Sequence, residues 1–226
     1  MSEKYLGSPF LMDMAKYFYG ILLFVRKQYR QPASFTFENR EYAYFEHPYN
    51  GTWMNERALE IPLAWTEIQS YSPNKVLEVG NVLSHYFEVK HPVVDKYEQR
   101  LGVISKDIMD VSFDHKFDCI ISISTIEHIG WDEIPRVPEK CIWAIEEMKQ
   151  MLSENGRLFI TIPLGYNTYL DKYLFDGKIE FSRVYFFKRL NRYEWQESGR
   201  EQVLGSTYGR KYRSTDGLAI CVWNRM

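Results

Sequence analysis

A series of short apolar segments, most of which end in glycine, proline or a polar residue, constrains the fold of this chain more than any other feature. The segments VLEVG and FDCIISIS lack a regular polar alternation, as expected for strands that are buried on both faces of a parallel sheet. Their spacing leaves room for helical crossovers, which predicts a three-layer α/β/α sandwich with a mostly parallel sheet. The seven candidate strands lie at 75–80, 91–95, 102–104, 117–124, 157–163, 181–188 and 218–223.

Three helices and one hairpin are predicted around these strands. Proline in a first turn and Asn-Gly after a last turn mark helix ends. Two β-prone runs around a polar turn indicate a hairpin. The predicted helices are 9–29, 54–70 and 138–152, and the hairpin is 34–46. The N-terminal helix, the hairpin and the second helix are interpreted as a cap or lid region at 1–70, and 71–226 as the ligand-binding domain.

Composition excludes several classes of protein. A chain of 226 residues with a formal net charge of −2 suits one compact unit and argues against general nucleic-acid coating. Cys119, Cys141 and Cys221 lack metal-ligand spacing, so we expect buried reduced thiols, no metal site and a cytoplasmic location. The apolar stretch 17–25 is far too short to span a bilayer, and no secretory signal is apparent.

Polar residues follow several of the predicted strands. Ligands of open α/β sheets bind beyond the carboxyl ends of the strands, where Glu78, Gly80, Asp95 and Asp107 lie. Glycine lets the backbone approach a ligand, and amides at the start of a following helix can face an anionic group. A carboxylate at the second strand suits a ribose diol, and one beyond the third suits an adenine amino group. Taken alone, Asp107 is more typical of a helix cap or a solvated loop, Asp95 is as typical of a cap as of a ligand site, and Glu78 must find donors inside an apolar strand end. Three acids at successive strand ends favour a nucleoside site.

These segments resemble the Rossmann-like, seven-stranded (class I) S-adenosylmethionine-dependent methyltransferases. The resemblance covers residues 70 to 226, and LAICVW at 218–223 suits the terminal hairpin of that family. It implies a Rossmann-like sheet and S-adenosyl-L-methionine as the cofactor. The matching segments are VLEVG at 76–80, VVDKYE at 93–98, KDIMD at 106–110, FDCIISISTIEHIG at 117–130 and MKQMLSENGRLFITIP at 148–163.

The resemblance also implies roles for individual residues. It implies that Glu78 and Gly80 form the first loop, with Gly80 and Asn81 near the methionine moiety of the cofactor. On the nucleoside side, it implies that Asp95 holds the ribose hydroxyls, that Lys96 flanks the adenine, and that Asp107 and Ile108 contact the adenine edge. It also implies that Ser124 and Thr125 line the methionine side. One departure is a first loop with a single glycine where the family has two or three. This departure keeps a non-catalytic, cofactor-binding scaffold as an alternative, and the missing GxGxxG argues against a dinucleotide dehydrogenase.

His128 is the predicted general base. Imidazole changes charge near neutral pH, and an oxygen acceptor needs a group that removes its proton. An alternative is that His128 only orients the EHIG turn. Glu127 and Asp132 are alternative bases or orienting groups, whereas His85 and His47 are weaker candidates.

The methyl acceptor is predicted to be a small molecule or a sugar hydroxyl. No Asn/Asp-Pro-Pro-Tyr/Phe segment and no Pro-Cys pair follows the fourth strand, which disfavours methylation of DNA bases. The segment 183–213 holds eight Lys or Arg against three Glu, an excess of five positive charges. That excess favours a solvated face, a pocket for an anionic acceptor or, third, an RNA surface. Trp53 and the loop around it are expected to cover the cofactor.

Overall fold

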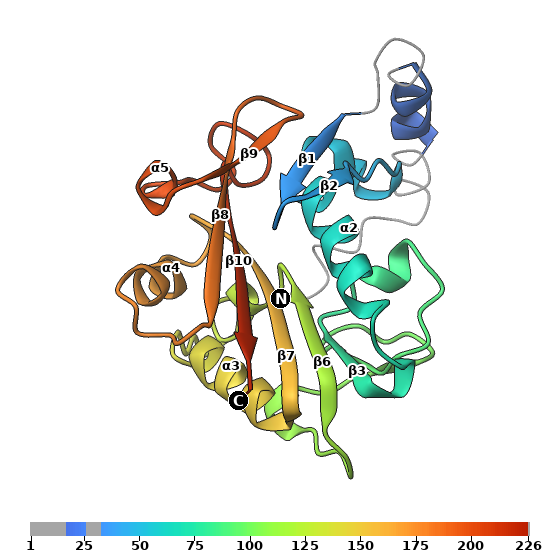
Figure 1. Ribbon diagram of the computed structural model, residues 1–226, viewed down its shortest axis with the longest axis vertical. Coiled ribbons are helices and arrows are strands. Elements are labelled where there is room, and N and C mark those ends of the chain that lie inside the picture. The colour runs from blue at the N-terminus through green and yellow to red at the C-terminus, as the bar shows by residue number, and fades with distance from the viewer. Residues whose placement is uncertain (1–16, 26–32, 226) are drawn as a thin grey trace.

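A central eight-stranded sheet organises the protein, whose computed structural model describes residues 17–25 and 33–225 (Figure 1). The strand order is β5-β4-β3-β6-β7-β10-β8-β9. The strands are β3 (Val76–Val79), β4 (Val93–Val94), β5 (Val103–Ile104), β6 (Phe117–Ile123), β7 (Leu152–Pro163), β8 (Arg183–Arg189), β9 (Trp195–Ser198) and β10 (Gly217–Asn224).

The sheet has a parallel half and an antiparallel half. Strands β3 to β7 pair in parallel, whereas β10 pairs antiparallel with both β7 and β8, and β9 pairs antiparallel with β8. The order in the parallel half runs outward in both directions from the β3–β6 pair, which makes that pair the switch point of the sheet. The predicted α/β sandwich with a mostly parallel sheet is confirmed, and β9 is an additional eighth strand.

Helices and a hairpin cover the two faces of the sheet (Figure 1). Helices α3 and α4 lie on one face, and α2 with the β1–β2 hairpin lies on the other. Their bounds are α2 (Arg57–Ile68), α3 (Lys140–Met151), α4 (Thr168–Phe175), α5 (Arg200–Val203), β1 (Ser34–Phe37) and β2 (Arg40–Ala43). Residues 17–25 are also helical, and the rest of the predicted helix 9–29 lies outside the described residues.

Alternation along the strands divides the core between these two faces. Ile120 packs on the α3 side, and its neighbour Ile121 packs on the α2 side. On the α2 side, Phe35 and Phe37 of the hairpin contact Phe187 of β8 with ring centroids 6.1 and 6.2 Å apart. The described part of the region before residue 70 therefore shares a hydrophobic core with the sheet. The division into a cap or lid region at 1–70 and a ligand-binding domain at 71–226 stays a prediction.

Short 3-10 helices follow three of the parallel strands: η3 (Leu83–His85) follows β3, η4 (Ile108–Asp110) follows β5, and η5 (Ile126–His128) follows β6. Two others come earlier in the chain, η1 (Tyr49–Met54) after the hairpin and η2 (Pro73–Lys75) directly before β3. The helix whose first amides were expected to follow the turn at Gly80 is the three-residue η3.

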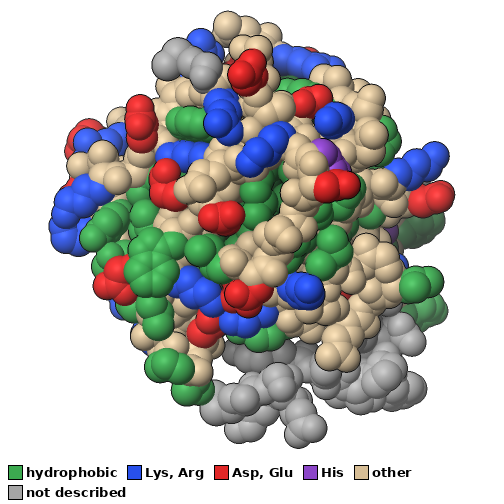
Figure 2. Space-filling view, turned by 90° about the horizontal axis from the view of Figure 1, so that it is seen from below, with side chains coloured by type: hydrophobic (Ala, Val, Ile, Leu, Met, Phe, Trp, Pro, Cys, Tyr) green, Lys and Arg blue, Asp and Glu red, His purple; other side chains and the backbone are tan. Residues whose placement is uncertain are grey.

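The surface is mixed in charge. Figure 2 shows Lys and Arg side chains interspersed with Asp and Glu on one face of the molecule, in keeping with the net charge of −2. No helix among the described residues is both long enough and apolar enough to cross a bilayer. Within residues 17–25 and 33–225, no group of three His, Cys, Asp or Glu side chains is placed to hold a metal ion.

Candidate functional site

The loops after β3 and β6 meet at the switch point. Gly80 has a φ of +89°, a value that side chains disfavour, and a Cβ built on it would lie 2.0 Å from Oγ1 of Thr125. The Gly80 amide donates to the carbonyl of Val94 at 2.8 Å, which ties the loop to β4 as well. Glycine is thus required here both by conformation and by the close approach of the two loops.

Glu78 holds the first loop in place from inside the sheet. Its side chain is fully buried, and Oε1 accepts from the amides of Val82 and Leu83, both at 2.8 Å. Oε2 lies 2.9 Å from Nε2 of His91. A buried carboxylate must find donors, and these amides supply them. The expectation that amides after Gly80 face an anionic ligand is therefore corrected for these two, which are directed at Glu78.

Asn81 brings an unused donor to the same loop. Its amide donates to Oδ2 of Asp95 at 2.9 Å, and its side-chain oxygen accepts from Ser84. Its Nδ2 is buried and has no hydrogen-bond partner among the described residues. Oδ1 of Asp95 accepts from the amides of Tyr97 and Glu98. Since a carboxylate offers about four acceptor positions, Asp95 keeps capacity for a further donor. A buried donor without a partner indicates space for a ligand acceptor or a water.

Two of the three predicted adenine-side residues, Lys96 and Asp107, belong to a four-membered ion network. Oδ2 of Asp107 lies 3.0 Å from Nζ of Lys96 and 2.5 Å from Nζ of Lys140, and both lysines also pair with Glu133. Burial opposes ionisation, but the mutual hydrogen bonds outweigh it, so the pKa values of Asp107 and Glu133 are lowered and that of Lys96 is raised. Ile108 follows in η4 and is buried. Adenine contacts for these residues stay a prediction.

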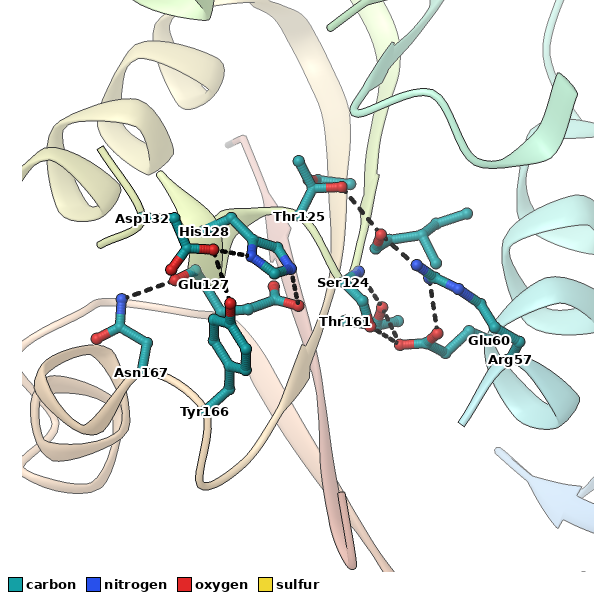
Figure 3. Close-up of polar contacts among 12 residues, drawn as sticks. Arg57, Glu60, Ser124, Thr125, Glu127, His128, Asp132, Thr161, Tyr166 and Asn167 are labelled. Atoms are coloured by element: carbon teal, nitrogen blue, oxygen red, sulfur yellow. Dashed lines mark hydrogen bonds and ion pairs between the residues drawn. The ribbon is translucent and has the colours of Figure 1, made fainter. Parts of the chain in front are cut away.

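Ser124 and Thr125 follow β6 and differ in their partners (Figure 3). Oγ of Ser124 donates to Oε1 of Glu60 at 2.5 Å, and Thr161 donates to the same oxygen at 2.7 Å. Oε2 of Glu60 accepts from Arg57 at 2.9 Å. Oγ1 of Thr125 donates back to the strand carbonyl at Ile123. Ser124 is thus committed to a buried network anchored on α2, which the sequence analysis did not identify.

His128 lies in a second polar group on the other side of β6 (Figure 3). Its Nδ1 lies 2.6 Å from Oδ2 of Asp132, an oxygen that also accepts from the hydroxyl of Tyr166 at 2.7 Å. The rings of His128 and Tyr166 are 4.6 Å apart, edge to face. The side chain of His128 is 45% exposed, so it can meet a ligand. Because a carboxylate only accepts, Nδ1 carries the hydrogen in the neutral ring and Nε2 keeps its lone pair.

Glu127 lies beneath His128, with Oε1 3.5 Å from Nε2 of the imidazole. Burial is the main cause that raises the pKa of Glu127 well above its usual range, and the charge of Glu60 adds to it. Asn167 donates to the backbone carbonyl of Glu127 at 3.0 Å and so joins this turn to the start of α4. A carboxyl group that resists ionisation next to an exposed histidine is typical of a functional site.

The weaker candidates lie on the first loop and its cover. The ring of His85 stacks on Tyr49 of η1 at 4.9 Å, and Nδ1 of His47 accepts from the Tyr49 amide. Trp53 is 4% exposed and packs on Tyr19, 5.8 Å away. The η1 segment therefore contacts the loop after β3, and a covering role for Trp53 stays a prediction.

The basic segment 183–213 is partly used inside the fold. Arg189 is buried and donates to the carbonyl of Met54 and to Ser214. Nζ of Lys188 lies 3.3 Å from Oδ2 of Asp216. These contacts remove part of the positive excess that favoured an RNA surface.

A cleft of about 440 Å³ opens beside the His128 group, between α4 and the loop after α5. Tyr208 lines it and contacts Tyr166, 4.9 Å away, which joins the cleft to His128. Asp171 also lines it, and its Oδ2 accepts from the amide of Gly165 at 2.7 Å. The cleft is further lined by Leu164, Thr168, Phe175, Val203, Leu204, Gly205, Ser206, Thr207 and Arg210.

The burial of Asp171 leads us to expect a measurable pH dependence of the free energy of unfolding. Burial raises its pKa to about 6, so between about pH 4 and 6 the folded state binds a proton that the unfolded state has lost. The free energy of unfolding therefore falls as pH rises through this window, by up to about 3 kcal/mol. In Asp171→Asn, whose amide oxygen can still accept from Gly165, this fall is expected to disappear. Urea unfolding at pH 4.5 and 7.5 measures it, and identical pH profiles for the two proteins would contradict it.

No protein-family model and no curated protein sequence matches the chain. Among solved structures, it is similar to the N-methyltransferase NodS from Bradyrhizobium japonicum WM9 in complex with S-adenosyl-L-homocysteine, at 12% identity and a TM-score of 0.41, over 75% of this chain and 87% of that chain.

Two further solved structures show the same kind of likeness. An rRNA methylase from Streptococcus thermophilus has 12% identity and a TM-score of 0.43, over 74% of this chain and 97% of its own. A SAM-dependent methyltransferase from Thermotoga maritima has 15% identity and a TM-score of 0.42, over 71% of this chain and 87% of its own. In fold, the chain is similar to methyltransferases of known structure.

Proposed function

We propose that this protein transfers a methyl group from S-adenosylmethionine to a small-molecule or sugar acceptor, at oxygen, with His128 as the base. The observation that carries the proposal is the first loop at the switch point, where Gly80 and the unused buried amide of Asn81 lie beside Asp95. Ligands of open α/β sheets bind at this position. Three buried, unpaired cysteines support a cytoplasmic location as part of the proposal.

The residues of the first loop fit this cofactor. Gly80 presents bare backbone, Nδ2 of Asn81 needs an acceptor, and Asp95 has capacity for a hydroxyl donor. When bound, S-adenosylmethionine supplies an activated methyl group on a sulfonium sulfur. The protein then has to hold the acceptor close and in line, and to exclude competing water.

In this proposal, His128 removes the acceptor proton. Asp132 fixes the imidazole through Nδ1 and leaves Nε2 as the basic atom. Tyr166 donates to the same carboxylate oxygen and holds it in position. The cleft next to this group, lined by Tyr208, offers space for the acceptor.

Calorimetry with S-adenosylmethionine and S-adenosylhomocysteine tests the cofactor assignment. We expect both compounds to bind the full chain. We expect Asp95→Ala to weaken binding at least tenfold, because it removes a charge-assisted hydrogen bond, and a loss of about 1.4 kcal/mol of binding free energy already corresponds to a tenfold change in affinity. Asp114→Ala, at a 98% exposed side chain, is the control and should bind as the parent does. No binding of either compound at millimolar concentration would reject the proposal.

His128→Ala is expected to lower turnover by about 100-fold or more and to leave cofactor affinity nearly unchanged, because proton transfer by a positioned base contributes on that scale. Release of S-adenosylhomocysteine is measured with fractionated small-molecule extract as the acceptor source. Added imidazole should restore part of the turnover, which a purely structural role of His128 would not allow. His115→Ala, at a histidine beside Asp114, is the control. Equal turnover in His128→Ala and the parent would end the assignment.

A non-catalytic, cofactor-binding scaffold is the second candidate, and two observations favour it. The amides of Val82 and Leu83 are used by Glu78, and the carboxylate of Asp107 is used by two lysines. A scaffold would bind S-adenosylhomocysteine but release none from S-adenosylmethionine with any extract fraction. The calorimetry and the turnover assay together therefore separate the two candidates.

A further inference from the structure

The charges of three buried carboxyl groups act on Arg57, which belongs to the Glu60–Ser124 group of the site. Glu56, Glu60 and Glu127 are 7%, 0% and 1% exposed, so all three are removed from bulk water. When all are ionised they carry three negative charges against the single positive charge of Arg57. Arg57 is itself committed, because NH1 pairs with Glu60 at 2.9 Å and donates to the carbonyl of Ile123. With all three ionised, Arg57 alone would not neutralise the cluster, and the second positive charge that acts on it is that of Arg189 beside Glu56.

Two of these carboxyl groups have an unused oxygen. Oε2 of Glu127 and Oε2 of Glu56 are buried, and neither has a hydrogen-bond partner in the part of the chain that the structure describes. Figure 3 shows the side chain of Glu127 reaching from beneath His128 toward the Arg57–Glu60 group. Leaving a buried polar atom without a partner costs about 1–3 kcal/mol. Buried polar atoms without a partner indicate a group outside the chain, a ligand or a water, that supplies the missing donors.

Aromatic rings complete the surroundings of these carboxyl groups. Burial raises the pKa of the Tyr208 hydroxyl, and the charges of Glu56 and Glu127 raise it further, so both carboxyl groups act on this side chain. Tyr208 lines the cleft and contacts the ring of Tyr166. Carboxylates together with aromatic faces are the groups that recognise organic cations. Tyr208 thus lies between the cleft that it lines and the two carboxyl groups whose charges act on it.

We propose that Glu127 and Glu56 bind a protonated amine of the methyl acceptor, beside His128. The inference rests on the proposed function and narrows the acceptor to an ammonium-bearing small molecule of the amino-sugar or amino-alcohol class. An ammonium supplies three donors, enough for both unused oxygens. An anionic group is disfavoured at these two oxygens, because it would meet the carboxylates directly, whereas Arg210 of the segment 183–213 lines the cleft itself.

Binding of such a cation is linked to a proton. Burial raises the pKa of Glu127, whereas a bound cation favours the ionised carboxylate, so cation binding and proton release are coupled. Affinity for the amine should therefore rise with pH, until the amine itself loses its charge. The groups that face Glu127 from the packed elements are Glu56, Arg57 and Glu60 from α2 and its N-terminal end, His128 from η5, and Tyr166 and Tyr208 from the loops beside the cleft.

The test measures binding of three ammonium probes against their neutral counterparts. Ethylammonium, ethanolamine and glucosamine are compared with ethanol, ethylene glycol and glucose by calorimetry, on the free chain and on the chain saturated with S-adenosylhomocysteine. We expect at least one ammonium probe to bind tenfold tighter than its counterpart, with proton release seen as a dependence on buffer ionisation enthalpy. Glu127→Gln and Glu56→Gln should each abolish this preference, and Glu88→Gln, at an exposed position, should retain it.

Two results would overturn the inference. No preference for any ammonium probe in the parent would show that only water meets the unused oxygens. The second is a loss of S-adenosylhomocysteine affinity in Glu127→Gln with unchanged affinity for 5′-methylthioadenosine, which lacks the amino-acid part. That pattern would assign the carboxyl groups to the ammonium of the cofactor. If the parent did not bind S-adenosylhomocysteine, the proposed function would be rejected. The preference for ammonium probes would still be tested by their binding to the free chain.

Discussion

Gly80→Ala is expected to lower the free energy of unfolding by about 2–5 kcal/mol and to abolish S-adenosylhomocysteine binding. Two costs combine. An alanine with a left-handed backbone costs about 1–2 kcal/mol, and forcing a methyl group into a filled space costs about 1–3 kcal/mol. The φ of Gly80 is +89°, and the added Cβ would lie 2.0 Å from Oγ1 and 2.7 Å from Cβ of Thr125. Urea unfolding and calorimetry measure the two effects.

Gly102→Ala is the matched control for this prediction. Its φ of +90° is nearly the same, but no described atom lies within 4 Å of the added Cβ, so only the backbone cost of about 1–2 kcal/mol is expected. Combining Gly80→Ala with Thr125→Gly removes the clash and should recover the difference between the two glycine positions. Equal losses in Gly80→Ala and Gly102→Ala would contradict a contact-based requirement at the switch point.

The parallel half of the sheet could be predicted because its strands are buried on both faces. Runs such as Phe117–Ile123 leave little choice of structure, and the segments along the chain follow each other with room for crossovers. The edge strand β9 could not be identified in this way, since Trp195 is the only fully buried residue of its four. Helix α4 was missed although it has a recognisable start, where the side chain of Asn167 accepts from the amides of Tyr169 and Leu170.

The positions of the site residues were easier to predict than their partners. Strand ends place Glu78 and Asp95 at one edge of the sheet, and sequence patterns identify strand ends. Partners depend on tertiary contacts instead. Glu60 meets Ser124 and Thr161 across 64 and 101 residues of sequence. An acid between Leu59 and Ile61 in an apolar helix was the available signal, since such a side chain must find donors when it is buried.

The ion network at Asp107 shows the same limit. Lys96 and Asp107 follow successive strands of the sheet, but Lys140 comes from α3 and Glu133 from the loop before it. Nothing in the local sequence indicates that a helix on one face of the sheet supplies a lysine to a carboxylate at the edge. Roles inferred for single residues from their strand position therefore have to be tested against the partners that the fold brings to them.

Glu78→Ala is expected to lower the free energy of unfolding by about 3–5 kcal/mol, because it removes one member of a buried, hydrogen-bonded group. The amides of Val82 and Leu83 would lose their acceptor, and His91 would lose its partner at 2.9 Å. S-adenosylhomocysteine affinity should fall at least tenfold, because the loop that holds Asn81 is released. Urea unfolding and calorimetry measure both quantities, with Glu88→Ala at an exposed position of the same region as the control, expected within about 0.5 kcal/mol of the parent.

Glu78→Gln separates the two functions of this carboxylate. Its amide oxygen can still accept from Val82 and Leu83, whereas the charge that meets His91 is lost, so a cost of only about 1–2 kcal/mol is expected. Because the first loop keeps its position in this variant, its affinity for the cofactor should stay near that of the parent. If the glutamine variant lost affinity as far as the alanine variant did, the charge of Glu78 rather than its hold on the loop would control binding. The first loop would then be positioned by the remaining contacts, chiefly those of Asp95.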